Sequence, residues 1–129
     1  MPRRPNVKRK YIPNNRRSKR NRVNKVHRTN RWTKLSVRYR QHNPSCEVHK
    51  HYGIIEPATE TDHIYRIADG GAPYDTNNLM SICNDCHNIK TAIENKGNLN
   101  LDFDLNENKE RIPTNKEQIY KLFKKIFAQ

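Results

Sequence analysis

The sequence predicts a small α+β domain that is stabilised by a bound metal ion and preceded by a disordered basic arm. Segments with strand and helix patterns alternate from residue 29 onward, and three cysteines lie at short spacings from one another or from histidines. Only 33% of the 129 residues are hydrophobic. A core this small needs additional stabilisation, which a metal ion often supplies. We therefore divide the chain into an arm, residues 1–28, and one domain, residues 29–129.

The arm is strongly basic. Residues 1–46 hold 16 Lys and Arg and no Asp or Glu, whereas residues 47–129 hold 10 Lys and Arg against 13 acidic residues. Residues 1–28 lack the apolar periodicity of a folded segment, so we expect disorder. A nucleic acid is the natural partner, because basic side chains that neutralise phosphates release counterions; a charge run kept for solubility is the alternative. The candidate contacts are Arg16, Arg17, Lys19, Arg20 and Arg22.

The composition also argues against a membrane or secreted protein. The basic segment has no amphipathic apolar face, and the chain has no apolar run of the roughly 20 residues that span a bilayer. Charges throughout the first residues argue against a secretory signal peptide. Three cysteines are an odd number, which suits metal ligation better than a disulfide framework. We expect a cytoplasmic protein.

The first half of the domain predicts one helix and two strands. Thr29 or Asn30 can cap a helix over residues 31–41, in which apolar side chains recur at helical spacing and Trp32 is expected in the core. Strands are expected around residues 54–55 and over residues 59–64. The Gly, Pro and Asn content of residues 68–77 predicts a loop.

The second half predicts two further helices. One covers residues 84–96, and residues 98–113 are predicted to be irregular. Thr114-Asn115-Lys116-Glu117 has the pattern of a capping box and begins an amphipathic helix over residues 114–128. We expect its apolar stripe to pack on the core, with partner binding as the alternative. The stripe consists of Ile119, Leu122, Phe123, Ile126 and Phe127.

Two short motifs predict one structural metal site. Cys83 and Cys86 supply two thiolates from a tight turn, and Cys46 and His49 supply a thiolate and an imidazole at the same spacing. Three cysteines and a histidine form a complete tetrahedral set of the kind that holds structural zinc. His51 competes with His49 for the fourth position, because a longer Cys-to-His spacing also occurs in zinc sites. Buried free cysteines are the simpler alternative.

A second group of residues lies between positions 61 and 90. It consists of Asp62-His63-Ile64, Gly70-Gly71, Asn78-Leu79 and Cys83-x-x-Cys86-His87-x-x-Lys90. In this order and at these separations the chain resembles the HNH endonuclease family over roughly residues 32–95, and most closely the small HNH endonucleases of bacteriophages. The resemblance implies a ββα-metal core of hairpin, loop and helix. His49 departs from the family pattern, which usually has a cysteine there.

The resemblance also implies a role for each residue of this group. His63 would be the general base that deprotonates water, and Asn78 would hold the loop and orient His63. Asp62 and His87 would bind a catalytic divalent ion, Mg²⁺ or another such as Mn²⁺; zinc ligation is the alternative for His87. Adjacent strand residues point to opposite faces, so Asp62 and His63 can serve one site only where the strand ends or bulges. Lys90 is expected to contact a phosphate oxygen.

The function implied by the resemblance is a divalent-metal-dependent DNA endonuclease that hydrolyses phosphodiester bonds. Resemblance to the phage members suggests a role in phage or prophage genome processing or packaging, with a terminase as partner. The alternatives are a non-catalytic zinc-containing nucleic-acid-binding protein and an RNA-binding structural protein. Either would explain the basic arm but would leave Asp62, His63 and Asn78 without a use.

Overall fold

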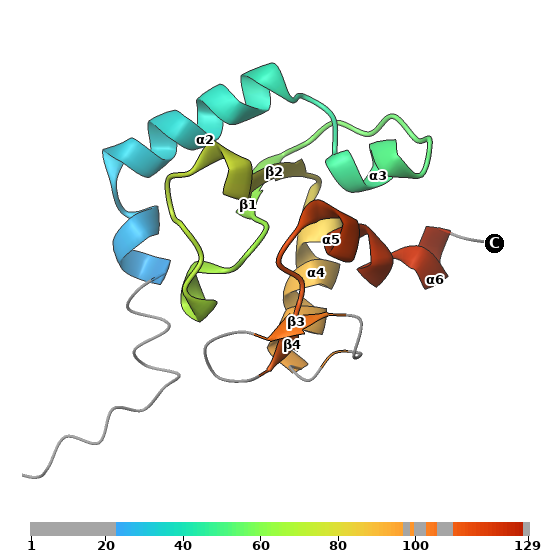
Figure 1. Ribbon diagram of the computed structural model, residues 1–129. Coiled ribbons are helices and arrows are strands. Elements are labelled where there is room, and N and C mark those ends of the chain that lie inside the picture. The colour runs from blue at the N-terminus through green and yellow to red at the C-terminus, as the bar shows by residue number, and fades with distance from the viewer. Residues whose placement is uncertain (1–22, 97–98, 100–102, 106–109, 128–129) are drawn as a thin grey trace, which may run out of the picture.

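The computed structural model describes residues 23–96, 99, 103–105 and 110–127. A helical segment over residues 23–27 leads into helices and two small sheets (Figure 1). In chain order these are α2 (Asn30–His42), α3 (Glu47–His51), β1 (Glu60–His63), β2 (Leu79–Ile82), α4 (Asn84–Lys96), β3 (Asp104–Leu105), β4 (Arg111–Ile112), α5 (Lys116–Leu122) and α6 (Lys124–Phe127). None of the helices in these stretches has the length and apolar character needed to cross a membrane.

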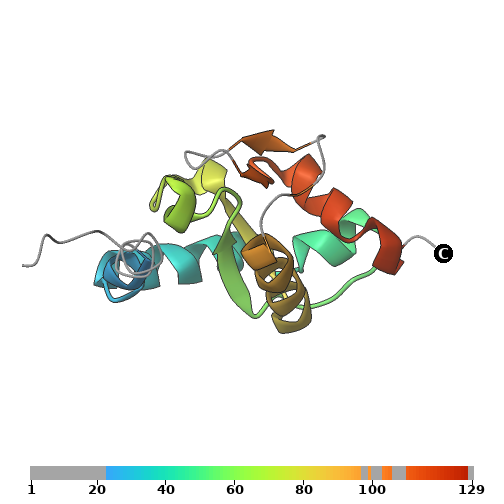
Figure 2. The ribbon, with the colours of Figure 1, turned by 90° about the horizontal axis from the view of Figure 1, so that it is seen from below.

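The centre of the fold is the antiparallel hairpin of β1 and β2, which lies between α2 and α4 (Figure 2). Thr61 and His63 are buried on the face toward α2, where the Thr61 hydroxyl donates a hydrogen bond to the carbonyl of Ser36 at 2.8 Å. The alternate residues, Glu60 and Asp62, face α4. Hairpin and α4 together form the predicted ββα core, so each face of β1 presents a different pair of side chains.

The free edge of β2 is covered by polar side chains. The carboxylate of Glu47 accepts hydrogen bonds from the backbone N–H of Ser81 and from the hydroxyl of Tyr39. The same hydroxyl lies 3.0 Å from the carbonyl of Leu79, so its single hydrogen is shared between the two acceptors, and the ammonium of Lys116 pairs with Glu47. Buried backbone groups of an edge strand need such partners.

Apolar residues form two clusters. One surrounds the cysteines and includes Ile119 and Phe123 of the C-terminal stripe, which are fully buried, so the prediction that this stripe packs on the core is confirmed except for Ile126, whose side chain is 48% exposed. The other contains Trp32, which lies in the core as predicted, with Val26, Ile67 and Leu79.

Several predicted boundaries were wrong. Residues 54–55 form no strand, and the side chain of Ile55 is 89% exposed. The partner of β1 is instead β2, whose four residues are all buried and show no alternation. Residues 98–113 contain the β3–β4 hairpin. The C-terminal helix is capped by Asn115, one residue later than Thr114, and is interrupted at Phe123.

The predicted arm was also too long. Residues 23–27 are helical, and Val26 is buried against the cluster of Trp32. The scattered aliphatic residues at positions 23 and 26 therefore belong to the core, which explains why this part is ordered. Residues 1–22, which hold the arginines and the lysine predicted to contact nucleic acid, lie outside the described residues.

Candidate active site and metal centres

The predicted structural metal ligands come together in one group. Cys46, His49, Cys83 and Cys86 each offer a ligand atom, and these atoms lie within 4.8 Å of one another. The Nδ1 atom of His49 lies 3.2 Å from the sulfur of Cys46 and 3.4 Å from that of Cys86. His51 belongs to no such group in the described structure and instead stacks on Tyr120, with ring centroids 4.1 Å apart. The geometry favours His49 as the fourth ligand.

Burial affects how readily the cysteines of this cluster ionise. All three cysteines are buried and free of disulfides. Burial raises the pKa of the thiols of Cys83 and Cys86 above the ordinary range. Burial opposes ionisation of Cys46 as well, but hydrogen bonds from His49 lower its pKa. A divalent cation would replace the thiol protons and hold the cluster as thiolates.

The face of β1 toward α4 brings Asp62 and His87 together. The Nδ1 atom of His87 lies 3.5 Å from a carboxylate oxygen of Asp62 and 3.3 Å from one of Glu60. His87 is in the first turn of α4, one residue after Cys86, and takes no part in the cysteine cluster. Burial by itself raises the pKa of Asp62, but the Lys90 ammonium and His87 hold the pKa below its ordinary value. Asp62 is therefore an anion.

Lys90 corrects one prediction. Its side chain is only 2% exposed, so its ammonium cannot contact a phosphate from this position. The ammonium lies 3.0 Å from a carboxylate oxygen of Asp62, donates to the carbonyl of His63 at 3.1 Å and pairs with Glu94. Burial lowers the pKa of Lys90, but the two carboxylates raise it above the ordinary value overall. Lys90 thus links the end of β1 to α4.

His63 lies on the opposite face of the strand from Asp62, at the last residue of β1. Its ring stacks on Trp32 with centroids 4.5 Å apart, and the ring of His27 lies beyond at 6.3 Å. The Nε2 atom donates to the carbonyl of Pro73 at 2.9 Å. Because a carbonyl only accepts, Nε2 carries the hydrogen and Nδ1 holds the lone pair. The side chain is 4% exposed, and this burial lowers the pKa of His63, which keeps the imidazole neutral.

Asn78 closes the loop that contains Pro73. Its amide accepts from the backbone N–H of Tyr65 at 2.8 Å and donates to the carbonyls of Tyr65 and Ala72 at 3.0 and 2.9 Å. Gly71 is required in this loop, since an added Cβ would lie 1.9 Å from the carbonyl oxygen of Tyr65. Asn78 therefore acts on His63 through the loop that supplies its hydrogen-bond acceptor.

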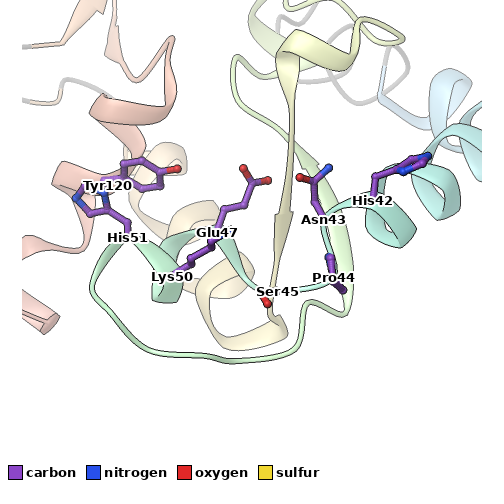
Figure 3. Close-up of a pocket in the computed structure, with 8 residues that line it drawn as sticks. All are labelled: His42, Asn43, Pro44, Ser45, Glu47, Lys50, His51 and Tyr120. Atoms are coloured by element: carbon purple, nitrogen blue, oxygen red, sulfur yellow. The ribbon is translucent and has the colours of Figure 1, made fainter.

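A pocket of about 400 Å³ lies elsewhere, between the end of α2, α3 and α5 (Figure 3). Its lining includes Glu47, whose carboxylate is already used by the edge of β2. None of Asp62, His63, Asn78 and His87 lines it. The candidate active site is thus formed at the end of the hairpin and not in this hollow.

Two residues of the site were missed from the sequence. Glu60 lies two positions before Asp62, and strand alternation would have placed both on one face. His27 and His42 were assigned no role from the sequence, because both lie outside the motif. Ring contacts between distant segments leave no signal in a single sequence, so the position of His27 beside His63, with centroids 6.3 Å apart, could not be predicted.

Comparison with known proteins agrees with this geometry. Residues 44–92 match the family model of HNH endonuclease. The fold is similar to that of the HNH endonuclease of the deep-sea thermophilic bacteriophage GVE2, whose crystal structure contains a manganese ion, with a TM-score of 0.55 and 24% identity. The similarity covers 62% of this chain and 89% of that chain. No curated protein matches the sequence.

Proposed function

We propose that this chain, whose residues 44–92 match the family model of HNH endonuclease, hydrolyses phosphodiester bonds of DNA with the help of a divalent metal ion. The observation that carries this proposal is the meeting of Asp62 and His87 on one face of the hairpin, at the strand end that bears a neutral His63 on its other face. The chemistry needs a base for water and stabilisation of charge on the phosphate.

His63 is the proposed general base. An imidazole that is neutral at physiological pH can accept a proton, and the hydrogen bond from Nε2 to Pro73 leaves Nδ1 as the accepting atom. The side chain is only 4% exposed and lies on the strand face opposite Asp62, so this role requires it to become accessible to water when DNA binds. Asn78 is a positioning residue, because it holds the loop that carries Pro73. Lys90 is a second positioning residue, because it bonds both the side chain of Asp62 and the carbonyl of His63.

Asp62 and His87 are the proposed ligands of the divalent ion. Carboxylate oxygen and imidazole nitrogen can bind Mg²⁺ or Mn²⁺, and the side chains of Asp62 and His87 are 17% and 34% exposed. The nitrogen of His87 is hidden from solvent without a hydrogen bond and lies beside the Asp62 carboxylate, which fits a bound cation. A divalent ion there would stabilise negative charge on the scissile phosphate and on the leaving oxygen.

The cysteine cluster is the proposed site of a structural zinc ion. Four ligands complete a tetrahedron and leave no open position for substrate. Because Cys86 and His87 are consecutive, the zinc would fix the direction in which α4 presents His87.

DNA as substrate follows from the family and is supported by the charge of the first third of the chain. A role in phage genome processing or packaging beside a terminase stays a prediction from the resemblance. Copurification of the chain with a terminase large subunit from an infected or induced host would test it.

Nicking of supercoiled plasmid tests the proposed function directly. The purified protein should nick with added Mg²⁺ or Mn²⁺, EDTA should abolish nicking, and Asp62→Asn should lose most of it. Glu56→Gln, which changes an exposed acid outside the site, is the matched control. Binding of DNA without any metal-dependent nicking would favour the non-catalytic zinc protein instead.

A further inference from the structure

We propose that Glu60 is a third protein ligand of the divalent ion bound by Asp62 and His87, an inference that rests on the proposed function. Glu60 and Asp62 are two residues apart on β1, so their side chains leave the strand on the same face. That face is covered by the first turn of α4, from which His87 reaches back to the strand. Three ligands thus come from two elements packed on each other.

The distances between these groups suit a shared ion. The Nδ1 atom of His87 lies 3.3 Å from an oxygen of Glu60 and 3.5 Å from an oxygen of Asp62. An octahedral ion with bonds of about 2.0–2.1 Å separates neighbouring ligand atoms by about 3 Å. A shift of a few tenths of an ångström would therefore place both pairs at neighbouring positions of one ion.

The atoms that face one another here have few other partners. An oxygen of Glu60, an oxygen of Asp62 and Nδ1 of His87 are hidden from solvent; those of Glu60 and His87 make no hydrogen bond among the described residues, and that of Asp62 is paired with the ammonium of Lys90. Buried polar atoms are usually paired, so the two unpaired atoms beside the Asp62 carboxylate point to a cation between them. Lys90 lies 3.0 Å from Asp62 but divides its single charge between Asp62 and Glu94. It therefore does not balance both strand carboxylates.

The site lies close to the surface. The side chains of Glu60 and His87 are 38% and 34% exposed, in contrast to the 2% of Lys90, although the atoms that face one another are hidden from solvent. Three protein ligands leave further positions of an octahedral ion for water and a phosphate oxygen. A protonated His87 that bridges the two carboxylates without any metal is the alternative arrangement.

Titration of the zinc-loaded full chain with Mn²⁺ distinguishes a bound ion from a protonated His87 that bridges the two carboxylates. Electron paramagnetic resonance measures the free Mn²⁺ in each titration. We expect Glu60→Gln to weaken Mn²⁺ binding at least about tenfold, since removal of even outer-shell partners costs 10- to 100-fold. Glu60→Asp should be intermediate, because it keeps a shorter carboxylate. Glu56→Gln is the matched control, and circular dichroism checks that each variant is folded.

Relaxation of water protons gives a second readout. Loss of one protein ligand should let another water bind Mn²⁺, so relaxation per bound ion should rise in Glu60→Gln and not in Glu56→Gln. Wild-type affinity and relaxation in Glu60→Gln, with weak binding in His87→Ala, would overturn the role of Glu60 and leave the proposed function intact. If Asp62→Asn and His87→Ala also bound Mn²⁺ normally, the proposed catalytic ion site itself would be wrong.

Discussion

Two clusters meet at consecutive residues of α4: the cysteine cluster and the carboxylate–histidine cluster of Glu60, Asp62 and His87. They differ in the type of ligand atom, in the number of ligands and in exposure to solvent. The first has soft ligands, a complete tetrahedral set and buried cysteines. The second has hard oxygen ligands and an imidazole, and its side chains are partly exposed. A closed, soft site suits a structural ion, and an open, hard site suits a reactive one.

The comparison shows how the first turn of α4 can supply ligands to two different ion sites. Consecutive residues of a helix point about 100° apart, as 3.6 residues make one turn. Cys86 therefore faces the cysteine cluster while His87 faces β1. The four experiments below change one side of this comparison at a time.

Removal of the ion from the cysteine cluster should have the largest effect. We expect one zinc per chain and cooperative unfolding on chelation, because structural zinc contributes about 10–16 kcal/mol in small domains, comparable to the whole stability of a domain. Metal analysis and thermal melting by circular dichroism measure this. His49→Ala should lose zinc and His51→Ala should keep it. A Cys83→Ser variant with unchanged melting would contradict the structural role of the cluster.

Removal of the His63 imidazole should greatly slow DNA nicking and leave both ion sites intact. We expect His63→Ala to reduce single-turnover nicking on the order of 10² to 10⁴-fold at saturating Mg²⁺, since the base acts in the transition state. Zinc content and Mn²⁺ affinity should not change. His42→Ala, an exposed histidine outside the site, serves as the control. Wild-type nicking by His63→Ala would show that another group deprotonates water.

Loss of the Lys90 ammonium should act on stability and not on DNA binding. We expect Lys90→Met to destabilise the domain by about 3–5 kcal/mol, because it leaves Asp62 and Glu94 without their buried partner. Chemical denaturation measures this effect. The salt dependence of DNA binding should stay as in the wild type. A log–log slope reduced by about 0.9 would instead mean that Lys90 binds a phosphate after all.

Truncation of the arm should have the smallest effect on the folded domain. Residues 1–22 hold ten Lys and Arg, and their deletion should flatten the salt dependence of DNA binding by about 0.9 for each phosphate that the arm neutralises in the full chain. Melting and zinc content should not change. Deletion of residues 1–28 should in addition lower the melting temperature, because Val26 packs in the core. An unchanged salt slope in both truncations would assign the arm to a protein partner or to solubility.

The sequence predicted elements whose ends are marked by local signals. Helix α4 begins and ends as predicted, since its first turn is the Cys-x-x-Cys motif that starts at Cys83 and Gly97 follows its last residue in the sequence. Helix α2 begins after Thr29, whose side chain accepts from the backbone N–H of Trp32 as its cap. Such signals act between residues close in sequence, which is why a single chain reveals them.

The missed features depend on contacts between distant segments. Residues 54–55 have β-branched side chains but no strand beside them, whereas β2 has little strand preference and is formed by burial against β1 and both clusters. Helical spacing correctly placed Lys90 on the face of His87, but the sequence could not show that Asp62 would occupy its ammonium. Glu60 was missed because the motif was taken to begin at Asp62.

The covered edge of β2 has a consequence for assembly. Backbone groups on the outer side of an edge strand are the template on which a strand of another molecule can pair. In this protein the N–H of Ser81 and the carbonyl of Leu79 are already bonded to Glu47 and Tyr39. A second copy therefore cannot extend the hairpin by adding a strand at these positions. Two active sites acting on opposite DNA strands would have to be brought together through another surface.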